Sequence, residues 1–277
     1  MLEAVKKMCR GRGPLLLALS GGADSTALYH LMREAGHPFE VLHIDHQWRP
    51  ESGAEAQALA ARVAVPFHLR TLEKPVKNAE DTARHGRLRL YRELCIERHL
   101  EGVLLAHHAD DQAETVLKRL FEGARLTKLA GLVEERLIEG VCLLRPLLAF
   151  RKRALIDYLD ALGATYFVEA PARDLRSRMR TELLPLLTLH FGKEVVPSLC
   201  RLARESEELC TKKEHFWLKE RLANDFEKEG VVLSRHTLNA VALHIANGNR
   251  RKELRVRQGR VTIDEGVVIY NKRIDEE

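Results

Sequence analysis

Near its start the chain contains a short segment, LSGGADS, in which two glycines and an aspartate interrupt an apolar run. Glycine lets the backbone approach a phosphate closely, and the hydroxyl groups of Ser20 and Ser25 can donate hydrogen bonds to it. The carboxylate of Asp24 can hold a metal ion that bridges phosphates. The segment is not a Walker A loop, because the chain has no G-K-[ST] sequence, and it is not G-x-G-x-x-G either. It predicts an anion site at a helix start, with a plain capped turn as the alternative.

A second polar segment, HHADDQAET, occupies residues 107–115. A helix that starts near Asp110 would place Asp111 and Glu114 on one face, because residues three apart are neighbours on a helix. Two carboxylates beside an amine could bind a lysine ammonium, assist its deprotonation or help to hold Mg²⁺. The alternative is that Asp110 caps the helix and the other acids favour its dipole. For His107 and His108 a structural and a catalytic role both stay open, since a single histidine is more often structural.

Strand-like and helix-like segments alternate through the first half of the chain. We predict strands at 15–19, 39–45, 66–72 and 102–108, and helices at 26–33, 54–63, 79–99 and 110–123. This alternation indicates βαβ units and therefore an α/β fold with a doubly wound, mainly parallel sheet. In such sheets ligands bind beyond the carboxyl ends of the strands, where both polar segments fall. His43 and Asp45 lie at the end of the second strand and join the candidate site.

The pattern changes after about residue 148. An amphipathic helix ends at Gly163, a charged helical region runs to about residue 228, and alternating residues near the C-terminus suggest a small hairpin. We predict a catalytic domain at 1–188 and a smaller, mostly helical α+β domain at 189–277.

Composition restricts the class of protein. Five scattered cysteines without a C-x-x-C pair argue against a disulfide framework and against a zinc or iron–sulfur site. The chain has no apolar run of about 18 residues and its start is too polar for a signal peptide, so we expect no membrane association and a cytoplasmic protein. The net charge of +5 and the arginine clusters allow a phosphate-rich partner, with solvated helix faces as the alternative. These clusters lie at 84–92, 150–153, 173–180 and 249–260.

The sequence S-G-G-x-D-S after a first strand resembles the PP-loop of the N-type ATP pyrophosphatases, a Rossmann-like superfamily. The resemblance implies a loop that cradles the pyrophosphate of ATP while the α-phosphate is transferred to a carbonyl-type oxygen. The implied contacts are Ser20, Gly21, Gly22, Ala23, Asp24 and Ser25, with Mg²⁺ at Asp24. The loop alone does not choose among the members, which include GMP, NAD and asparagine synthetases and several tRNA-modifying enzymes.

Further segments resemble one family within this group. LHIDHQWRPES (42–52) and the H-H-x-x-D-Q-x-E-T pattern within 106–131 are similar to the tRNA(Ile)-lysidine synthetases. The segments at 143–159 and 176–187 match that family as well, and the resemblance is strong over 14–188. It implies ATP-dependent ligation of L-lysine to the wobble cytidine of an isoleucine tRNA with a CAU anticodon. The implied intermediate is an adenylated tRNA, and the products are lysidine, AMP and pyrophosphate.

The resemblance also implies roles for individual residues. The implied catalytic residues are Asp24, His107, Asp111 and Glu114, of which Asp111 and Glu114 would also bind lysine. His43 and Asp45 would contact ATP. Arginine contacts with substrate or RNA are expected from Arg84, Arg87, Arg145 and Arg178. The C-terminal domain is a candidate for tRNA binding, and a homodimer is left open.

Three other functions compete with this interpretation. A tRNA 2-thiolation enzyme would share the loop and the tRNA, but such enzymes commonly use paired cysteines, which this chain lacks. A small-molecule amidotransferase is less favoured, because the chain has no glutaminase-like domain. A non-catalytic RNA-binding module with a degenerate loop is disfavoured by the intact motif at 20–25.

Overall fold

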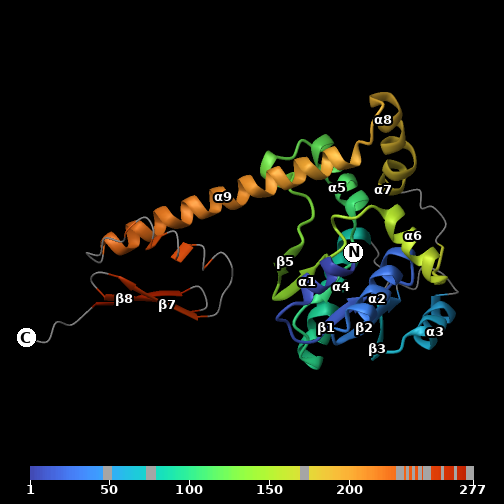
Figure 1. Ribbon diagram of the computed structural model, residues 1–277, viewed down its shortest axis with the longest axis horizontal. Coiled ribbons are helices and arrows are strands. Elements are labelled where there is room, and N and C mark those ends of the chain that lie inside the picture. Colours follow the sequence, from blue (N-terminus) through green and yellow to red (C-terminus); the bar gives the residue numbers. More distant parts are fainter. Residues whose placement is uncertain are drawn as a thin grey trace, which may run out of the picture. The chain divides into compact units, whose positions relative to one another are not determined.

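The chain forms two compact units, Met1–Arg204 and Glu205–Glu277 (Figure 1). The computed structural model describes residues 1–45, 52–72, 79–168, 175–228, 234, 237–238, 241–242, 245, 251–256, 259–264 and 267–272. The predicted domain boundary after residue 188 falls inside helix α8 (Leu184–Phe191). The first unit continues beyond it because α8 and the start of α9 (Val196–Lys228) pack against α5 (Ala109–Phe121).

The first unit is built on a sheet with the strand order β3-β2-β1-β4-β6-β5. The strands are β1 (Leu15–Ala18), β2 (Phe39–Asp45), β3 (Phe67–Thr71), β4 (Val103–Leu104), β5 (Glu135–Ile138) and β6 (Val141–Leu144). Every neighbouring pair is parallel except β5 and β6, which are antiparallel at one edge. The predicted mainly parallel, doubly wound sheet is therefore confirmed.

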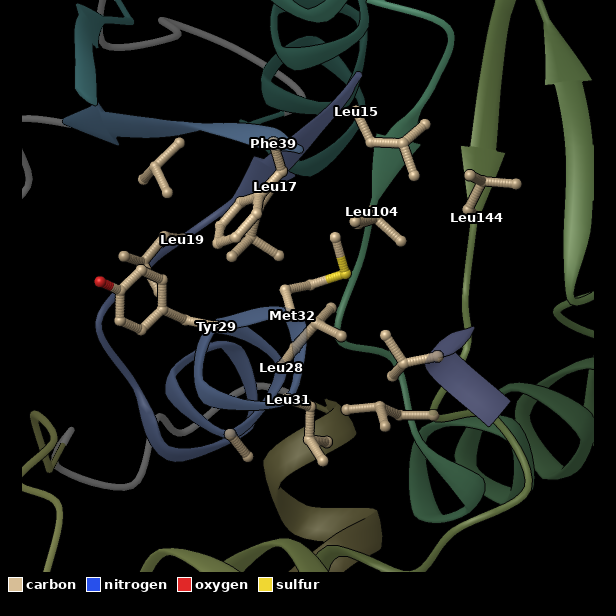
Figure 2. Close-up of a cluster of buried hydrophobic side chains, with 14 of the residues drawn as sticks. Leu15, Leu17, Leu19, Leu28, Tyr29, Leu31, Met32, Phe39, Leu104 and Leu144 are labelled. Carbon is tan, nitrogen blue, oxygen red and sulfur yellow. The ribbon is translucent and has the colours of Figure 1, made fainter. Parts of the chain in front are cut away.

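Helices cover both faces of this sheet because successive strand residues point to opposite sides. The helices are α1 (Leu2–Cys9), α2 (Ala23–Ala35), α3 (Ser52–Arg62), α4 (Ala79–Arg98) and α6 (Lys152–Leu162). Leu15 and Leu17 pack with α1, α2 and α6, and Figure 2 shows these strand residues facing α2. Leu16, between them in sequence, packs on the opposite face with Leu94 of α4.

Short segments complete the first unit. They are η1 (Leu126–Lys128), α7 (Leu175–Arg178) and η2 (Met179–Leu183), a π-helical turn between α7 and α8. Across the described parts of the chain, no helix combines the length and the apolar character that a membrane crossing requires.

The β5–β6 hairpin was not among the predicted elements. Its two strands are joined by Glu139 and Gly140, which have φ values of 51° and 81°. Positive φ at both central residues is the geometry of a tight hairpin turn, for which glycine is well suited. The short runs ERLI and VCLL on either side of this pair were the sequence signal that could have predicted the hairpin.

The second unit contains an antiparallel sheet of three strands in the order β7-β8-β9. These are β7 (Arg251–Val256), β8 (Gly259–Asp264) and β9 (Val267–Lys272), one strand more than the predicted hairpin. Residues 249–250 and 257–258 of the basic cluster at 249–260 lie outside the described residues.

The site is positioned by the point where the strand order reverses. β1 lies between β2, which follows it in the chain, and β4, which comes after two further crossovers. The loop after β1 and the segment after β4 therefore leave the sheet side by side at its carboxyl edge. Ligands of open α/β sheets bind at this switch point.

Candidate active site at the carboxyl edge of the sheet

The loop that follows β1 is held in shape by its own serine hydroxyls. The Ser25 hydroxyl accepts a hydrogen bond from the Gly21 amide at 3.2 Å and lies 3.0 Å from the Ser20 hydroxyl. It also lies 3.1 Å from the Gly22 carbonyl, to which it can donate. The loop leads directly into α2, and the first amides of a helix have no acceptor within it. Backbone donors and the positive end of the helix dipole thus coincide, which favours a phosphate.

Gly21 is the position where this loop requires glycine. Its φ is +87°, a conformation that side chains of L-residues rarely adopt. A Cβ atom there would lie 2.4 Å from Cδ2 of Phe167, whose amide donates to the Gly21 carbonyl at 2.8 Å. Gly22 differs, because its φ is −71° and, of the atoms that the structure describes, its Cβ would meet only the Ser20 hydroxyl, at 3.6 Å. The segment after α6 therefore closes over the loop at residue 21.

A cavity of about 340 Å³ lies beside this loop, between α2, α3 and the segment after α6. Gly21, Thr26 and Phe167 line the side nearest the loop. The Arg62 guanidinium, also in the lining, lies 5.8 Å from the centroid of the Phe167 ring. The volume falls within the roughly 300–1,000 Å³ typical of small-molecule sites.

Asp24 is the acidic residue of the loop. Its Oδ2 atom lies 3.3 Å from Lys152 Nζ and 3.5 Å from His108 Nε2. Burial opposes ionisation of Asp24, but the two basic side chains outweigh it and hold its pKa below the usual value. Within the described part of the chain, Asp24 Oδ1 is buried and has no hydrogen-bond partner. An ionised carboxylate with a spare oxygen is a suitable ligand for a hard cation.

His108, rather than Asp110, caps the start of α5. Its Nδ1 atom accepts a hydrogen bond from the Asp111 amide at 3.4 Å, and the His108 amide donates to Asp111 Oδ2 at 3.0 Å. Because Nδ1 accepts, the ring proton is on Nε2, which lies 3.3 Å from Asp111 Oδ2 and faces Asp24. Burial disfavours protonation of His108, but the surrounding carboxylates outweigh it and raise its pKa. This fully buried ring lies between the loop and α5.

Asp110 connects α5 to α6. Its Oδ2 atom accepts from the Lys152 amide at 2.8 Å, and its Oδ1 atom accepts from Arg151 Nε at 3.1 Å. Burial of Asp110 is outweighed by these donors, so its pKa is lowered. The two contacts fix the first turn of α6 and bring the Lys152 side chain to Asp24.

Asp111 and Glu114 lie on one face of α5 and share a single cation. Arg180, on η2, donates from Nε to Glu114 Oε1 at 2.6 Å and from Nη2 to Asp111 Oδ1 at 3.1 Å. Only 2% of the Glu114 side chain is exposed, and burial raises its pKa even though Arg180 opposes the shift. A carboxylate with a raised pKa accepts a proton more readily. The pair therefore forms a cation subsite that contains a proton acceptor.

His107 lies next to a buried arginine. Its Nδ1 atom accepts from Arg145 Nε at 3.2 Å, and Arg145 also donates to the Val133 carbonyl at 2.8 Å. Burial, together with the charge of Arg145, lowers the pKa of His107 to about 4, against the opposing effect of Asp111. The ring is therefore neutral at neutral pH. Burial lowers the pKa of Arg145 to about 10, and the like charges of Arg136 and Arg84 add to this shift.

His43 supports the loop from the neighbouring strand. Its Nδ1–H donates to the Leu19 carbonyl at 2.8 Å, and its ring stacks on Phe67 with centroids 6.4 Å apart. Asp45 ends β2, where its carbonyl accepts from the Leu72 amide at 2.9 Å. Both residues lie on the strand beside β1, and their contact with ATP stays a prediction. His46, the next residue in the chain, lies outside the described residues.

The predicted arginines differ in their surroundings. Arg84 is exposed on α4, and Arg87 on the same helix is half-buried. The Arg178 side chain is largely exposed, with Nε 3.8 Å from Glu182 Oε2, and does not contact the acid pair. Arg145 is buried against His107, so its direct contact with a substrate, like the role of the other three, stays a prediction.

Comparisons with known proteins agree with this geometry. A family model described as the PP-loop domain matches residues 1–187. The tRNA(Ile)-lysidine synthase of Chlamydia pneumoniae is 39% identical to this chain, over 92% of each. The protein of the same name from Chlamydia muridarum is 45% identical, over 70% of this chain and 64% of its own length. The chain belongs to the tRNA(Ile)-lysidine synthase family.

A solved structure extends the likeness beyond the lysidine synthases. The U34-tRNA thiolase NcsA from Methanococcus maripaludis, solved with its [4Fe-4S] cluster, has a TM-score of 0.61 and 18% identity over 75% of this chain and 78% of its own. This shows a shared fold. In this lysidine synthase family member none of the five cysteines, all of which lie among the described residues, forms a disulfide bond. Among the described residues, no three His, Cys, Asp or Glu side chains form a metal-binding group. The relatives named tRNA(Ile)-lysidine synthase do not favour the 2-thiolation alternative.

The structure brings three further residues to this lysidine synthase site. His108 and Lys152 contact Asp24, and Arg180 contacts the acid pair. Histidine is not among the strongly preferred capping residues, so the position of His108 just before the acidic first turn of α5 was only a weak indication that it caps the helix. Lys152 and Arg180 belong to the basic clusters at 150–153 and 173–180. The sequence does not indicate which basic side chain of each cluster reaches the site, because that depends on the tertiary structure.

Proposed function

We propose that this chain ligates lysine to the wobble cytidine of an isoleucine tRNA with a CAU anticodon, using ATP and releasing AMP and pyrophosphate. Membership of the lysidine synthase family supports lysine ligation to this tRNA. The observation that carries the proposal is that His108 joins the phosphate loop to the acid pair formed by Asp111 and Glu114. His108 Nε2 lies 3.5 Å from Asp24 of the phosphate loop and 3.3 Å from Asp111 of the acid pair. An anion site and an ammonium site therefore adjoin, as ATP-driven amine transfer requires.

The first step of the proposed reaction adenylates the tRNA. The C2 carbonyl oxygen of the cytosine attacks the α-phosphate of ATP, forming an oxygen–phosphorus bond and releasing pyrophosphate. The amides of the loop at 20–25 and the ammonium of Lys152 stabilise the charge that develops on the phosphates. The target base must leave its stack to reach this edge of the sheet, and bases of an anticodon loop are already partly unstacked.

Mg²⁺ is the metal that fits this site. The buried Oδ1 atom of Asp24, without a hydrogen-bond partner among the described residues, is a hard ligand on a carboxylate whose pKa is lowered. Mg²⁺ is typically bound by one or two carboxylates together with substrate phosphates, so a complete protein cage is not needed. When bound, it would neutralise charge on the leaving pyrophosphate.

The second step transfers lysine. An ε-amine with an ordinary pKa of about 10.4 must lose a proton before it can act as a nucleophile. Asp111 and Glu114 bind the ammonium, and the raised pKa of Glu114 suits it to receive that proton. The neutral amine attacks C2 of the cytosine, a carbon–nitrogen bond forms, and the carbon–oxygen bond to AMP breaks. The products are lysidine and AMP.

Replacement of Asp24 by alanine tests the ATP half of this proposal. Pyrophosphate release in the presence of tRNA, lysine and ATP should fall by about two orders of magnitude or more, because charge stabilisation at the leaving group is lost. Asp157→Ala is the matched control, since Asp157 is a carboxylate that pairs with the exposed Arg153 on the surface of α6. Full pyrophosphate release by Asp24→Ala would reject the loop as the ATP site.

A further inference from the structure

The acid pair assigned to the lysine ammonium is already filled by a cation of the chain. The Arg180 guanidinium bridges both carboxylates, with distances of 2.6 Å to Glu114 and 3.1 Å to Asp111. It uses one oxygen of each carboxylate, Oε1 of Glu114 and Oδ1 of Asp111. The remaining oxygen of Asp111, Oδ2, accepts from the His108 amide at 3.0 Å. The oxygen of Asp111 that faces the subsite is thus occupied.

We propose that Arg180 is an internal competitor for the lysine side chain, a gate that must be displaced before the ammonium can bind. The inference rests on the proposed function, because it takes Asp111 and Glu114 to be the ammonium subsite. The affinity for lysine is then set by two terms, the attraction of the acid pair for the ammonium and the loss of the Arg180 contacts. The apparent association constant for lysine is the intrinsic constant multiplied by the fraction of molecules in which Arg180 does not occupy the subsite.

Charge balance at the acid pair explains why the lysine ammonium must replace the Arg180 guanidinium. Glu114 is 2% exposed, and an ionised carboxylate at such a position requires a partner. If Arg180 left without a replacement, Glu114 would be buried with its charge uncompensated or would take up a proton. An arriving ammonium removes this cost. Departure of Arg180 and arrival of lysine are therefore coupled, and the charge of the subsite is the same before and after.

The surroundings of Arg180 allow it to move. Its side chain is 38% exposed, whereas that of Glu114 is almost completely buried, so the guanidinium covers the subsite from the solvent side. It belongs to the π-helical turn η2, between two α-helical segments, and π-helical turns are frequent at functional sites. Met179 beside it is buried and anchors the turn, so displacement of Arg180 requires a change of side-chain rotamer rather than unfolding of η2.

Titration calorimetry of the full chain with L-lysine, without tRNA or ATP, tests the gate directly. Arg180→Gln should bind lysine about tenfold more tightly than the natural chain, if Arg180 occupies the subsite in roughly nine molecules of ten. Arg180→Lys, which keeps a cation but loses the two-pronged contact, should fall between them. Arg153→Gln removes an exposed arginine that pairs with Asp157 and should leave the affinity unchanged. Affinity that is equal or weaker in both Arg180 variants would overturn the proposal.

Two further measurements separate the possible failures. Arg180→Gln leaves Glu114 without a cation, so thermal melts accompany the titrations, and Arg180→Lys decides the matter if Arg180→Gln does not fold. Incorporation of labelled lysine into tRNA by the natural chain tests the proposed function separately. If labelled tRNA forms but neither Arg180 variant binds lysine more tightly, the gate is rejected and the function stands. If no labelled tRNA forms and no lysine binds, the function itself is rejected, and the gate with it.

Discussion

Gly21→Ala should be among the most damaging small substitutions in this chain. The new methyl group would lie 2.4 Å from Cδ2 and 2.6 Å from Cε2 of the Phe167 ring, so the ring or the loop must move. Overpacking of this kind costs about 1–3 kcal/mol. Alanine at a φ of +87° adds about 1–2 kcal/mol of backbone strain. The free energy of unfolding should therefore fall by about 2–5 kcal/mol.

Gly22→Ala is the matched comparison, because it adds the same methyl group one residue later. Its φ of −71° is ordinary, and its Cβ would be 3.6 Å from the Ser20 hydroxyl, a normal contact. Its cost should be about 0.5–1 kcal/mol, because alanine is less favourable than glycine at the N-cap position that Gly22 occupies. Urea denaturation of both variants measures the difference.

The two costs of Gly21→Ala can be separated with Phe167→Ala. In that background the clash disappears and only the backbone strain remains, so Gly21→Ala should cost about 1–2 kcal/mol. The coupling between the two sites, obtained from the double-mutant cycle, should be about 1–3 kcal/mol. Equal losses of stability from Gly21→Ala and Gly22→Ala, or zero coupling with Phe167, would refute the reasoning.

Two further predictions concern the polar residues after β4. Asp111→Asn should leave adenylation of tRNA, measured as pyrophosphate release without lysine, largely intact, while transfer of labelled lysine falls at least tenfold; loss of adenylation with unchanged lysine binding would contradict its role. For His107, the folded pKa of about 4 lies below the ordinary value of 6.5. As pH falls, the unfolded chain gains a proton first, so stability is lost between about pH 6.5 and 4 by roughly 2–3 kcal/mol. His107→Gln should reduce this loss in urea titrations, and an unchanged pH profile would argue against a neutral buried His107.

The fold was largely predictable because its signals are local. Apolar runs at Leu15–Ala18 and Phe39–Asp45 have the length of buried parallel strands, and periodic helices separate them. The β5–β6 hairpin was missed because its strands are only four residues long and its turn depends on a positive φ at Glu139. Strands of that length carry little periodicity.

The site was predictable only in part, because its contacts join distant segments. The spacing of Asp111 and Glu114 indicated a shared face of one helix. No pattern indicates that Arg180, 66 residues after Glu114, fills that pair. Lys152 reaches Asp24 over a separation of 128 residues, and only the packing of α6 against α2 brings them together. At the start of α5, the sequence offered Asp110 as the capping residue only in the alternative interpretation, and the structure shows that His108 forms the cap.

The central claim is that the energy of ATP, delivered at the loop after β1, joins lysine to a base of tRNA at the segment after β4. Mass spectrometry of nucleosides from isoleucine tRNA, after reaction with ATP and isotopically labelled lysine, tests it most directly. The expected product is a labelled nucleoside that equals cytidine plus lysine less one water, formed only when ATP, lysine and the natural chain are all present. A labelled product without ATP, or ATP-dependent pyrophosphate release with no labelled nucleoside, would contradict it.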